Sequence, residues 1–372
     1  MCCPAKERLR EAFMSFNTQR VIIAAGGTGG HIVPSIVVAK ELKKKGVEIF
    51  WICSTRKRDS EILSSYNWKL YPLDIKGVKG RGVYGVLNYF FSFPKSARKV
   101  AAILKEVKPF AIFGCGGYLS VLPVLIGKLK GIPACIHEAE TAPGLANKAL
   151  APFVDLITTA YTECPFSSLK KTVVTGQPLR EEIFKVKKRK RFSSKPQNLL
   201  ILGGSQGANS LDKIALKLIP FFSEHNLAVI HQCREENLNY LISAYKEGGV
   251  KAEVKPFIKE IEEAYSQCDL IISRAGANAV AEIDVVGVPA ILIPLPSSSY
   301  NHQLKNALLL EQKGQGLCVE EEKDKTDKKV KEVLSYLLSS PEKYREMIKK
   351  EPLTPENAAL KIAEEIVKLK SR

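Results

Sequence analysis

Long apolar runs are missing from this 372-residue chain, and no stretch approaches the roughly 20 consecutive apolar residues of a membrane-spanning helix. Residues 1–20 contain no apolar core of signal-peptide length, so we expect them to form a loose extension. The nine cysteines are an odd number without Cys-X-X-Cys spacing, which argues against a disulfide framework or a zinc site. Those in or beside strand-like apolar runs are expected to be buried free thiols: Cys53, Cys115, Cys135, Cys233 and Cys268.

Acidic residues are few relative to basic ones. The chain carries 56 lysines and arginines against 39 aspartates and glutamates, a formal net charge of +17 at pH 7. This balance indicates an acidic partner, namely a nucleic acid, a phosphorylated ligand or an anionic membrane, although a well-solvated surface would carry the same charge. No nucleic-acid-binding motif is present, so nucleic acid is not an expected partner.

Short apolar runs alternate with helical stretches along the chain, an order that is typical of βαβ units around a parallel sheet. The expected strands of the first half are residues 21–25, 48–53, 109–115, 134–137, 155–159 and 172–175. Those of the second half are residues 198–202, 228–232, 252–255, 270–273 and 290–294. Residues 33–45 and 211–222 are expected to be helices.

The two halves open alike, with "VIIAAGGTGGH" and "NLLILGGSQGAN". Each combines a strand, a double glycine, a hydroxyl residue, another glycine and a helix. The chain is long enough for two cores, so we predict two doubly wound α/β domains. The first would comprise residues 21–180 with the amphipathic tail 355–372, and the second residues 181–354. A basic connector at 184–191 is expected to be a solvated linker.

The glycine-rich turns fit the dinucleotide-binding fingerprint poorly. Ile32 stands at the third glycine position of the first turn, and no acidic residue closes the following strand. Neither turn carries the Lys-Ser/Thr pair of a P-loop. Glycines still let the backbone approach a ligand, and free N–H groups at a helix start favour an anion. The alternative is that these glycines serve only the close packing of strand against helix.

A third turn, "SRAGANAVAEI", follows a strand and opens a helix. The N–H groups of Ala277, Asn278 and Ala279 would lie at the helix start, where a diphosphate can bind. Glu282, further along the helix, would then accept hydrogen bonds from vicinal hydroxyls. The alternative is an ordinary exposed glutamate.

Eight short motifs occur in order: "GGTGGH", "GGY", "HE", "GLANK", "TGQPLR", "GGSQGAN", "SRAGANAVAEI" and "HQLKNA". In order and spacing they resemble the MurG family of glycosyltransferases, from about Val21 to the C-terminal helix. The resemblance implies the GT-B fold, two Rossmann-like doubly wound domains facing across a cleft. It also implies inverting transfer of N-acetylglucosamine from UDP-N-acetylglucosamine to the C4 hydroxyl of the muramyl sugar of lipid I, which forms lipid II in peptidoglycan synthesis. The chain lacks an Asp-X-Asp motif, so neither a metal nor a cofactor is expected.

The resemblance also implies substrate contacts. For the first domain these are Thr28, Gly29 and Gly30, which would line the donor side of its cleft, together with Tyr118, His137 and Glu140. For UDP and the donor sugar they are Arg180 and Ser205 at the diphosphate side, Ile258 at the uracil, Ala277, Asn278 and Ala279 at the diphosphate, Glu282 at the ribose and Gln303 at the sugar.

One departure from the family concerns the sequence "HEQN", which reads "HEAE" here. Glu140 thereby replaces the asparagine that touches the donor sugar. Because a sugar hydroxyl is a poor nucleophile, the reaction needs a general base. His31 is the first candidate, at a turn where burial and a helix start would keep it neutral. Glu140 is the second, and His31 would otherwise orient the acceptor diphosphate or cap the helix.

Residues 83–93, "VYGVLNYFFSF", form a bulky apolar segment with basic residues on both sides. Apolar burial and nearby positive charge suit an anionic bilayer surface. Part of the segment would pack in the first core, and the side chains expected to meet the membrane are Leu87, Tyr89, Phe90 and Phe91. The resemblance implies that the location is the cytoplasmic face of the bacterial inner membrane, as a peripheral protein.

Two other functions fit the same fold. One is a UDP-sugar 2-epimerase, which needs no lipid acceptor, and the other is a non-catalytic subunit that binds a UDP-sugar. The expected partners under the first hypothesis are UDP-N-acetylglucosamine, lipid I as an undecaprenyl-diphosphate-linked muramoyl pentapeptide, and the anionic membrane surface.

Overall fold

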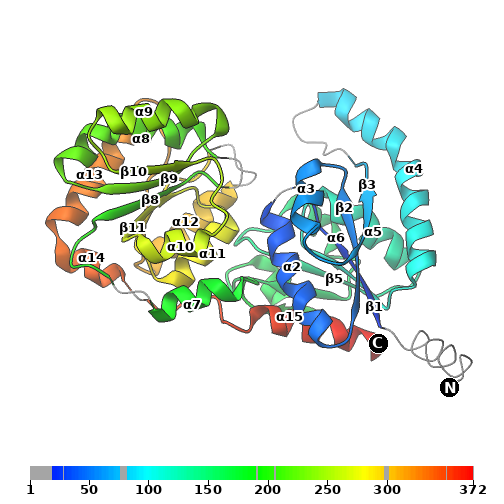
Figure 1. The fold of residues 1–372 in the computed structure, drawn as a ribbon. Coiled ribbons are helices and arrows are strands. Elements are labelled where there is room, and N and C mark those ends of the chain that lie inside the picture. Colours follow the sequence, from blue (N-terminus) through cyan, green and yellow to red (C-terminus); the bar gives the residue numbers. More distant parts are fainter. Residues whose placement is uncertain are drawn as a thin grey trace, which may run out of the picture. The chain divides into compact units, whose positions relative to one another are not determined.

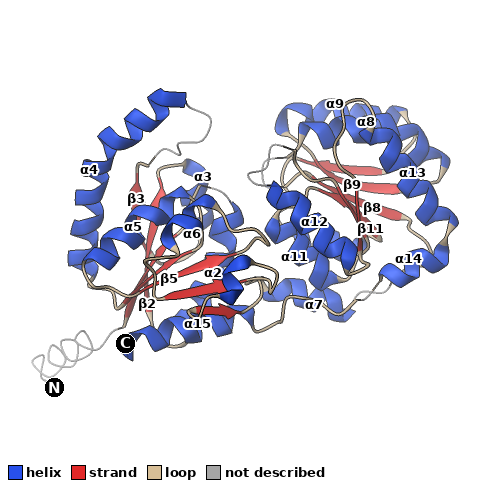
Figure 2. Cartoon of the chain, turned by 180° about the vertical axis from the view of Figure 1, so that it is seen from behind, coloured by secondary structure: helices blue, strands red, loops and turns tan. Residues whose placement is uncertain are grey.

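The computed structural model describes residues 19–27, 29–75, 82–189, 192–204, 207–296, 301–348 and 350–371. These residues divide into two compact units. The first takes the chain up to Ala139, then Pro143–Pro178, and resumes at Asn357. The second takes Glu140–Ala142 and Leu179–Glu356. In each unit, helices cover both faces of a parallel sheet (Figure 1 and Figure 2).

The first unit is built on a sheet in the order β3-β2-β1-β4-β5-β6-β7, with every neighbouring pair parallel. Its strands are β1 (Arg20–Ala24), β2 (Glu48–Ser54), β3 (Lys69–Leu73), β4 (Ala111–Gly114), β5 (Ala134–Glu138), β6 (Leu156–Thr159) and β7 (Thr172–Val174). Its helices are α2 (Gly29–Lys44), α3 (Lys57–Leu63), α4 (Gly82–Val107), α5 (Tyr118–Leu129), α6 (Leu145–Leu150) and α15 (Ala358–Lys368), with 3-10 turns at Pro165–Ser168 and Leu369–Ser371.

The strands β1, β2 and β4 of this first sheet are buried on both faces, which is why they are apolar at successive positions rather than at alternate ones. In β1, Val21 and Ile23 belong to one core cluster, and Ile22 belongs to another on the opposite face. The C-terminal helix α15 packs beside α2, as Figure 1 shows, and Ile362 and Ile366 join the first of these clusters. The amphipathic helix expected in the tail is thereby confirmed.

The second unit has a sheet in the order β10-β9-β8-β11-β12-β13, again parallel throughout. Its strands are β8 (Asn198–Leu202), β9 (Ala228–Gln232), β10 (Ala252–Lys255), β11 (Leu270–Ser273), β12 (Ala290–Leu292) and β13 (Gly316–Cys318). Its helices are α7 (Glu181–Arg189), α8 (Asn209–Glu224), α9 (Leu238–Glu247), α10 (Ile261–Gln267), α11 (Ala277–Val286), α12 (His302–Gln312), α13 (Thr326–Ser339) and α14 (Pro341–Met347), with a 3-10 turn at Glu235–Asn237.

Several expectations from the sequence need correction. The connector at 184–191 is not a solvated linker, because residues up to Arg189 belong to α7 and its Ile183, Phe184 and Val186 are buried in the second core. The helix expected from residue 33 begins at Gly29 instead, within the glycine-rich turn itself. The edge strands β3 and β13 were missed, since β13 has only three residues and β3 is only partly buried. The five cysteines expected to be buried free thiols are so.

Both sheets reverse their strand order at one point, between β1 and β4 in the first unit and between β8 and β11 in the second. In open parallel sheets, ligands bind at the carboxyl ends of the strands at such a point. The turn "GGTGGH" follows β1 and "GGY" follows β4, while "GGSQGAN" follows β8 and "RAGAN" follows β11. The glycine motifs of the sequence are therefore gathered in pairs at the two places where this topology binds ligands.

Candidate functional sites of the two units

The first glycine-rich turn is held by a buried carboxylate. Asp59, at the start of α3, accepts hydrogen bonds at Oδ2 from the Gly27 N–H at 2.7 Å and from the Ser54 hydroxyl at 2.6 Å. A Cβ at Gly26 would lie 2.6 Å from the same oxygen, so only glycine fits there. Arg56 closes the turn from the other side, donating from Nη1 to the Gly27 carbonyl at 2.7 Å.

His31 lies in the first turn of α2, half-buried against the "GGY" motif. Gly116 and Gly117 have φ values of 78° and 74°, in the left-handed region that favours glycine. A Cβ at Gly117 would lie 3.1 Å from His31 Nε2, so the glycines leave room for the imidazole. Burial lowers the pKa of His31 below its ordinary value, although a hydrogen bond with the Cys115 backbone opposes this shift. A neutral ring of this kind can accept a proton at pH 7.

Tyr118 opens α5 directly after these two glycines. Its hydroxyl oxygen would lie 3.4 Å from a Cβ at Gly27, which has a φ of 86°. Tyr118 and His31 therefore adjoin the same turn. Gly29 and Gly30 form the start of α2, whereas Thr28 lies outside the described residues.

His137 and Glu138 are both buried at the end of β5. The ring of His137 is hydrogen-bonded at Nδ1 to the Thr158 hydroxyl at 2.9 Å and at Nε2 to Gln177 Oε1 at 3.0 Å. Burial lowers the pKa of His137 to about 4. Glu138 accepts hydrogen bonds from the Gly144 N–H and the Asn147 amide, so it orients the "GLANK" segment. The "HE" pair thus connects three motifs of the sequence within the first unit.

The second unit presents a helix start at the end of β11. Gly276 precedes α11 in an extended conformation, and as a glycine it contributes no side-chain cap to the helix. The first N–H groups of α11, those of Ala277, Asn278 and Ala279, point out of the helix start, as they do in all α-helices. Because the helix dipole adds partial positive charge at that end, this is a suitable position for a phosphate.

Glu282 stands one and a half turns into α11 and is half-buried. Its Oε2 accepts a hydrogen bond of 3.0 Å from the hydroxyl of Tyr265, a fully buried residue of α10. Burial raises the pKa of Glu282, while the nearby Arg180 guanidinium and the Tyr265 hydroxyl act in the opposite direction. Arg180, just before α7, also lies 3.7 Å from Glu262 Oε2. Ile258, half-buried after β10, packs against the core cluster of the second unit that contains Tyr265.

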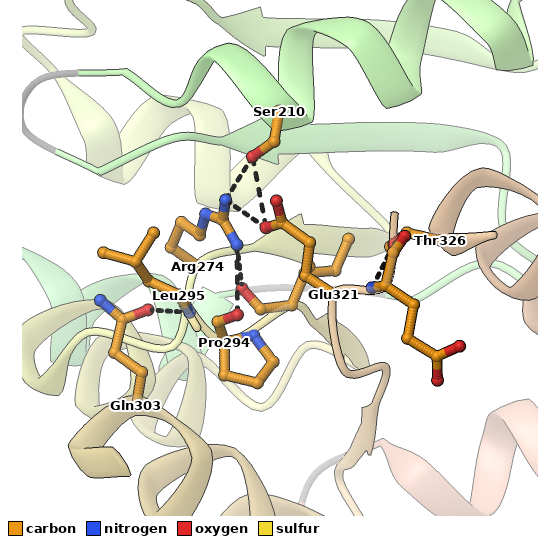
Figure 3. Close-up of polar contacts among 9 residues, drawn as sticks. Ser210, Arg274, Pro294, Leu295, Gln303, Glu321 and Thr326 are labelled. Carbon is orange, nitrogen blue, oxygen red and sulfur yellow. Dashed lines mark hydrogen bonds and ion pairs between the residues drawn. The ribbon is translucent and has the colours of Figure 1, made fainter. Parts of the chain in front are cut away.

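Arg274 follows β11 and joins three loops at the carboxyl edge of the second sheet (Figure 3). Its Nη1 donates to the carbonyls of Ile293 at 3.0 Å and Pro294 at 3.3 Å. Its Nη2 lies 2.6 Å from Glu321 Oε2 and also contacts the Ser210 hydroxyl. Since the side chain is almost fully buried, these bonds make it a structural clamp rather than a surface charge.

Gln303, in the first turn of α12, is oriented by the segment that Arg274 holds. The Leu295 N–H donates to Gln303 Oε1 at 2.9 Å, as drawn in Figure 3. An amide whose oxygen accepts a backbone hydrogen bond has its NH2 group left to donate. Gln303 therefore presents hydrogen-bond donors to any ligand at this edge.

Glu140 groups with the second unit, where its carboxylate accepts a hydrogen bond from Asn306 Nδ2. Asn306 is fully buried in α12 and also donates to the Ala275 carbonyl at 3.1 Å. Thr141 donates to the oxygen of the same amide from its N–H and its hydroxyl. Asn306 thus links Glu140, the residue that departs from the family pattern, to Ala275, which lies two residues before the start of α11.

Two groups of predicted residues cannot be placed in this way. Ser205 lies outside the described residues. Leu87, Tyr89, Phe90 and Phe91 belong to α4, but their side chains lie outside the described ones. Within the described part of the chain, no helix is both long enough and apolar enough to cross a bilayer. Nor do the described residues include a cluster of three or more histidine, cysteine, aspartate or glutamate side chains that could hold a metal ion.

Sequence reasoning missed three supporting residues. Asp59 holds the first glycine-rich turn, Tyr265 holds Glu282, and Arg274 holds the segment after β12. Arg274 stands inside a motif that the sequence analysis singled out, and its place directly after a strand was a usable signal. Asp59 stands among basic residues in "STRKRDS", and Tyr265 stands in an ordinary amphipathic helix. Neither of these two had a sequence pattern that would set it apart.

Two doubly wound parallel-sheet units, each with paired glycine motifs at its switch point, define the GT-B class of fold. The glycosyltransferase family 28 N-terminal domain matches residues 21–159 and the C-terminal domain of that family matches residues 198–366. A curated relative from Stutzerimonas stutzeri is 34% identical over 330 residues, covering 88% of this chain and 92% of the relative. It is named UDP-N-acetylglucosamine--N-acetylmuramyl-(pentapeptide) pyrophosphoryl-undecaprenol N-acetylglucosamine transferase. A relative of the same name from Desulfotalea psychrophila is 33% identical over 350 residues, covering 92% of this chain and 95% of its own length.

Solved structures match this chain over most of its length. The crystal structure of Acinetobacter baumannii MurG matches with a TM-score of 0.76 and 28% identity, covering 94% of this chain and 99% of that one. A UDP-GlcNAc 2-epimerase from Neisseria meningitidis, at 14% identity and a TM-score of 0.70, shares the fold. This chain belongs to the MurG family of glycosyltransferases, within glycosyltransferase family 28.

Proposed function

We propose that this protein transfers N-acetylglucosamine from UDP-N-acetylglucosamine to the muramyl sugar of lipid I and so forms lipid II. The observation that carries the proposal is a glycine-preceded start of α11 followed by a tyrosine-held carboxylate at Glu282, in a chain whose relatives are named for this transfer. A helix start and a carboxylate in this spacing suit the diphosphate and the ribose of a nucleotide-sugar.

The donor site is assigned to the second unit. Ala277 to Ala279 would offer N–H groups to the diphosphate, and Glu282 would accept hydrogen bonds from the ribose hydroxyls. Arg180 supplies positive charge on the same side. Ile258 would hold the uracil, and Gln303 would donate from its amide to the sugar. Ser205 is assigned to the diphosphate by its motif alone.

Negative charge develops on the outer phosphate oxygen of UDP as the glycosidic bond breaks. Helix-start N–H groups aimed at that oxygen stabilise the charge without reorganisation. Arg180 adds a full positive charge. The acceptor hydroxyl attacks from the opposite face of the sugar in a single displacement, which inverts the configuration at the anomeric carbon.

The acceptor site is assigned to the glycine-rich turn of the first unit. Its backbone N–H groups and the start of α2 suit the diphosphate of lipid I. His31 is proposed as the general base, because its neutral ring adjoins this turn. Glu140 is the alternative base, and its carboxylate accepts a hydrogen bond from Asn306.

The protein is further proposed to dock on the cytoplasmic face of the inner membrane through α4. Leu87, Tyr89, Phe90 and Phe91 would enter the bilayer surface, and the surrounding lysines and arginines would attract anionic lipid headgroups.

The test is to incubate the purified protein with radiolabelled UDP-N-acetylglucosamine and lipid I in detergent. Label is expected in the lipid fraction in a 1:1 ratio with UDP released. Conversion of the free UDP-sugar without lipid would instead identify an epimerase. Binding of UDP without either reaction would identify a non-catalytic subunit.

A further inference from the structure

The carboxylate of Glu282 is held by one side chain. The Tyr265 hydroxyl donates to Glu282 Oε2 at 3.0 Å, and no other hydrogen bond to the Glu282 side chain occurs among the described residues. The two residues come from α10 and α11, and Tyr265 is fully buried. The phenol is therefore a rigid reference point, whereas the glutamate side chain has three rotatable bonds.

The neighbouring charged groups do not fix this carboxylate. Arg180 and Glu262 form an ion pair at 3.7 Å, which is too long for a hydrogen bond. Within the described part of the chain, Arg180 Nε and Glu262 Oε2 are buried without hydrogen-bond partners. Arg180 therefore acts on Glu282 through charge, and the direction of the carboxylate depends on Tyr265.

Orientation matters here because of what a carboxylate can accept. With one lone pair of Oε2 occupied by Tyr265, Oε1 and the remaining lone pair of Oε2 are left for two further donors. Vicinal hydroxyls present two donors at a fixed spacing, so a pre-oriented carboxylate binds them with a smaller loss of rotamer entropy.

We propose that Tyr265 is a positioning residue for ribose recognition, which fixes the Glu282 carboxylate so that it accepts hydrogen bonds from both hydroxyls of the UDP ribose. This inference rests on the proposed function, since it requires a UDP-sugar in the second unit. It adds a residue that itself touches no substrate.

Ionisation gives the arrangement a second consequence. Burial raises the pKa of Glu282, and the Tyr265 hydrogen bond is one of the two interactions that oppose this rise. Removal of the hydroxyl would raise the pKa of Glu282 further. Protonated Glu282 would carry a hydrogen on one oxygen, and that oxygen could not accept from a ribose hydroxyl equally well.

The test is calorimetric binding of UDP and 2′-deoxy-UDP to Tyr265→Phe, a change that removes one oxygen and keeps the ring. We expect UDP affinity to fall about 3- to 10-fold, the range of one hydrogen bond, and 2′-deoxy-UDP affinity to fall less. The ratio of UDP affinity to 2′-deoxy-UDP affinity should therefore be smaller in the variant than in the native protein. On acidification the variant should lose UDP affinity at a higher pH than the native protein does.

Tyr245→Phe is the matched control. Tyr245 is also a buried tyrosine of the second unit, and its hydroxyl is hydrogen-bonded to His231 instead, at 3.0 Å. This variant should keep the UDP affinity and the ribose preference, and thermal unfolding would establish that both variants are folded. In a Glu282→Gln background, Tyr265→Phe should have little further effect on UDP binding.

Unchanged affinity and preference in Tyr265→Phe would overturn the inference, and so would an equal loss in both phenylalanine variants. Should Tyr265→Phe not fold, Glu282→Asp is the second variant, because its shorter side chain moves the carboxylate away from the Tyr265 hydroxyl. Retained UDP affinity and ribose preference in Glu282→Asp would then overturn the inference. If the native protein transfers the sugar but Tyr265→Phe binds UDP normally, only this inference fails. If the native protein does not bind UDP, the proposed function fails as well.

Discussion

Asp59 Oδ2 accepts a hydrogen bond of 2.7 Å from the backbone N–H of Gly27, 32 positions earlier in the chain. The same oxygen accepts from the Ser54 hydroxyl and the Ser54 N–H. A buried carboxylate with three donors holds the first glycine-rich turn in the conformation that the acceptor site is proposed to need.

Asp59→Ala should therefore weaken both stability and acceptor binding. Hydrogen bonds to charged groups are each worth about 1.5–3 kcal/mol, and the donors left behind would be buried. We expect a lower Tm and a several-fold higher KM for lipid I, with UDP affinity unchanged. Asp155→Ala is the control, since Asp155 accepts the Ala134 N–H in the same unit. If both variants raised the acceptor KM equally, the turn would have no special dependence on Asp59.

Glu282→Ala should raise the KM for UDP-N-acetylglucosamine about tenfold or more. The loss of hydrogen bonds between ribose hydroxyls and a charged acceptor corresponds to about 1.5–3 kcal/mol. Glu263→Ala removes an exposed carboxylate from the neighbouring helix α10 and should leave the donor KM unchanged. Donor affinity that survives Glu282→Ala would remove this residue from the site.

If His31 is the general base, His31→Ala should lower kcat by about 10²- to 10⁴-fold with donor binding nearly intact. Burial lowers the pKa of His31, so its neutral form persists below the ordinary value of 6.5. The rate should therefore fall only on the acidic side of that value, and this acidic limb should vanish in the variant.

The rival base and a control complete this experiment. His225→Ala should leave kcat and the limb unchanged, because His225 is exposed and bonded to the Phe221 carbonyl. Should Glu140→Gln flatten the acidic limb instead, Glu140 is the base. A limb that neither variant alters would leave both residues with positioning roles only.

The pH dependence of stability should report His137. Its folded-state pKa of about 4 lies below the ordinary value of 6.5, so the folded protein binds the proton less readily than the unfolded chain. Its contribution is therefore fully present above about pH 6.5 and is lost as the pH falls through 4, by about 3 kcal/mol for a shift of this size. Thermal unfolding between pH 7 and pH 4 should show a shallower decline in His137→Gln than in the native protein. Parallel curves would mean that His137 contributes nothing to acid sensitivity.

Simultaneous replacement of Leu87, Phe90 and Phe91 with serine should weaken binding to anionic vesicles while UDP affinity is kept. Burial of these apolar side chains in the bilayer surface is the proposed source of binding. Serine at Tyr240 and Ile242, which are exposed on α9, is the control and should leave vesicle binding intact. Sedimentation with vesicles measures the effect. An unfolded triple variant would show instead that the segment belongs to the core.

The positions of many strands and of the glycine-rich turns are determined by local stretches of the sequence. The runs that became β8, β9, β10 and β11 were expected at their observed bounds. For β8 and β11 the reason is that a strand buried on both faces is apolar at nearly every position. Glycines directly after such strands marked the turns at the two switch points. Motif order then indicated the family, since each motif is a contiguous stretch that can be read without knowledge of the fold.

The tertiary structure decided what holds those motifs in place. The connector at 184–191 was expected to be solvated because its lysines and arginines are conspicuous. Its helix is nevertheless anchored by Ile183, Phe184 and Val186 on one face, and that face is buried only because the second core lies beneath it. A count of charges does not reveal which side of a short helix finds a partner.

The same holds for the supporting hydrogen bonds. Asp59 reaches Gly27 across 32 positions, and Tyr265 reaches Glu282 across 17. Aspartate and tyrosine in a helix are ordinary at any position. Asp59 meets Gly27 only when the segments after β1 and β2 come together, and Tyr265 meets Glu282 only when α10 and α11 do. Periodicity and glycine are local properties that the sequence determined by itself, whereas the partner of a buried polar side chain is a property of the fold, because distant segments must meet before the hydrogen bond can form.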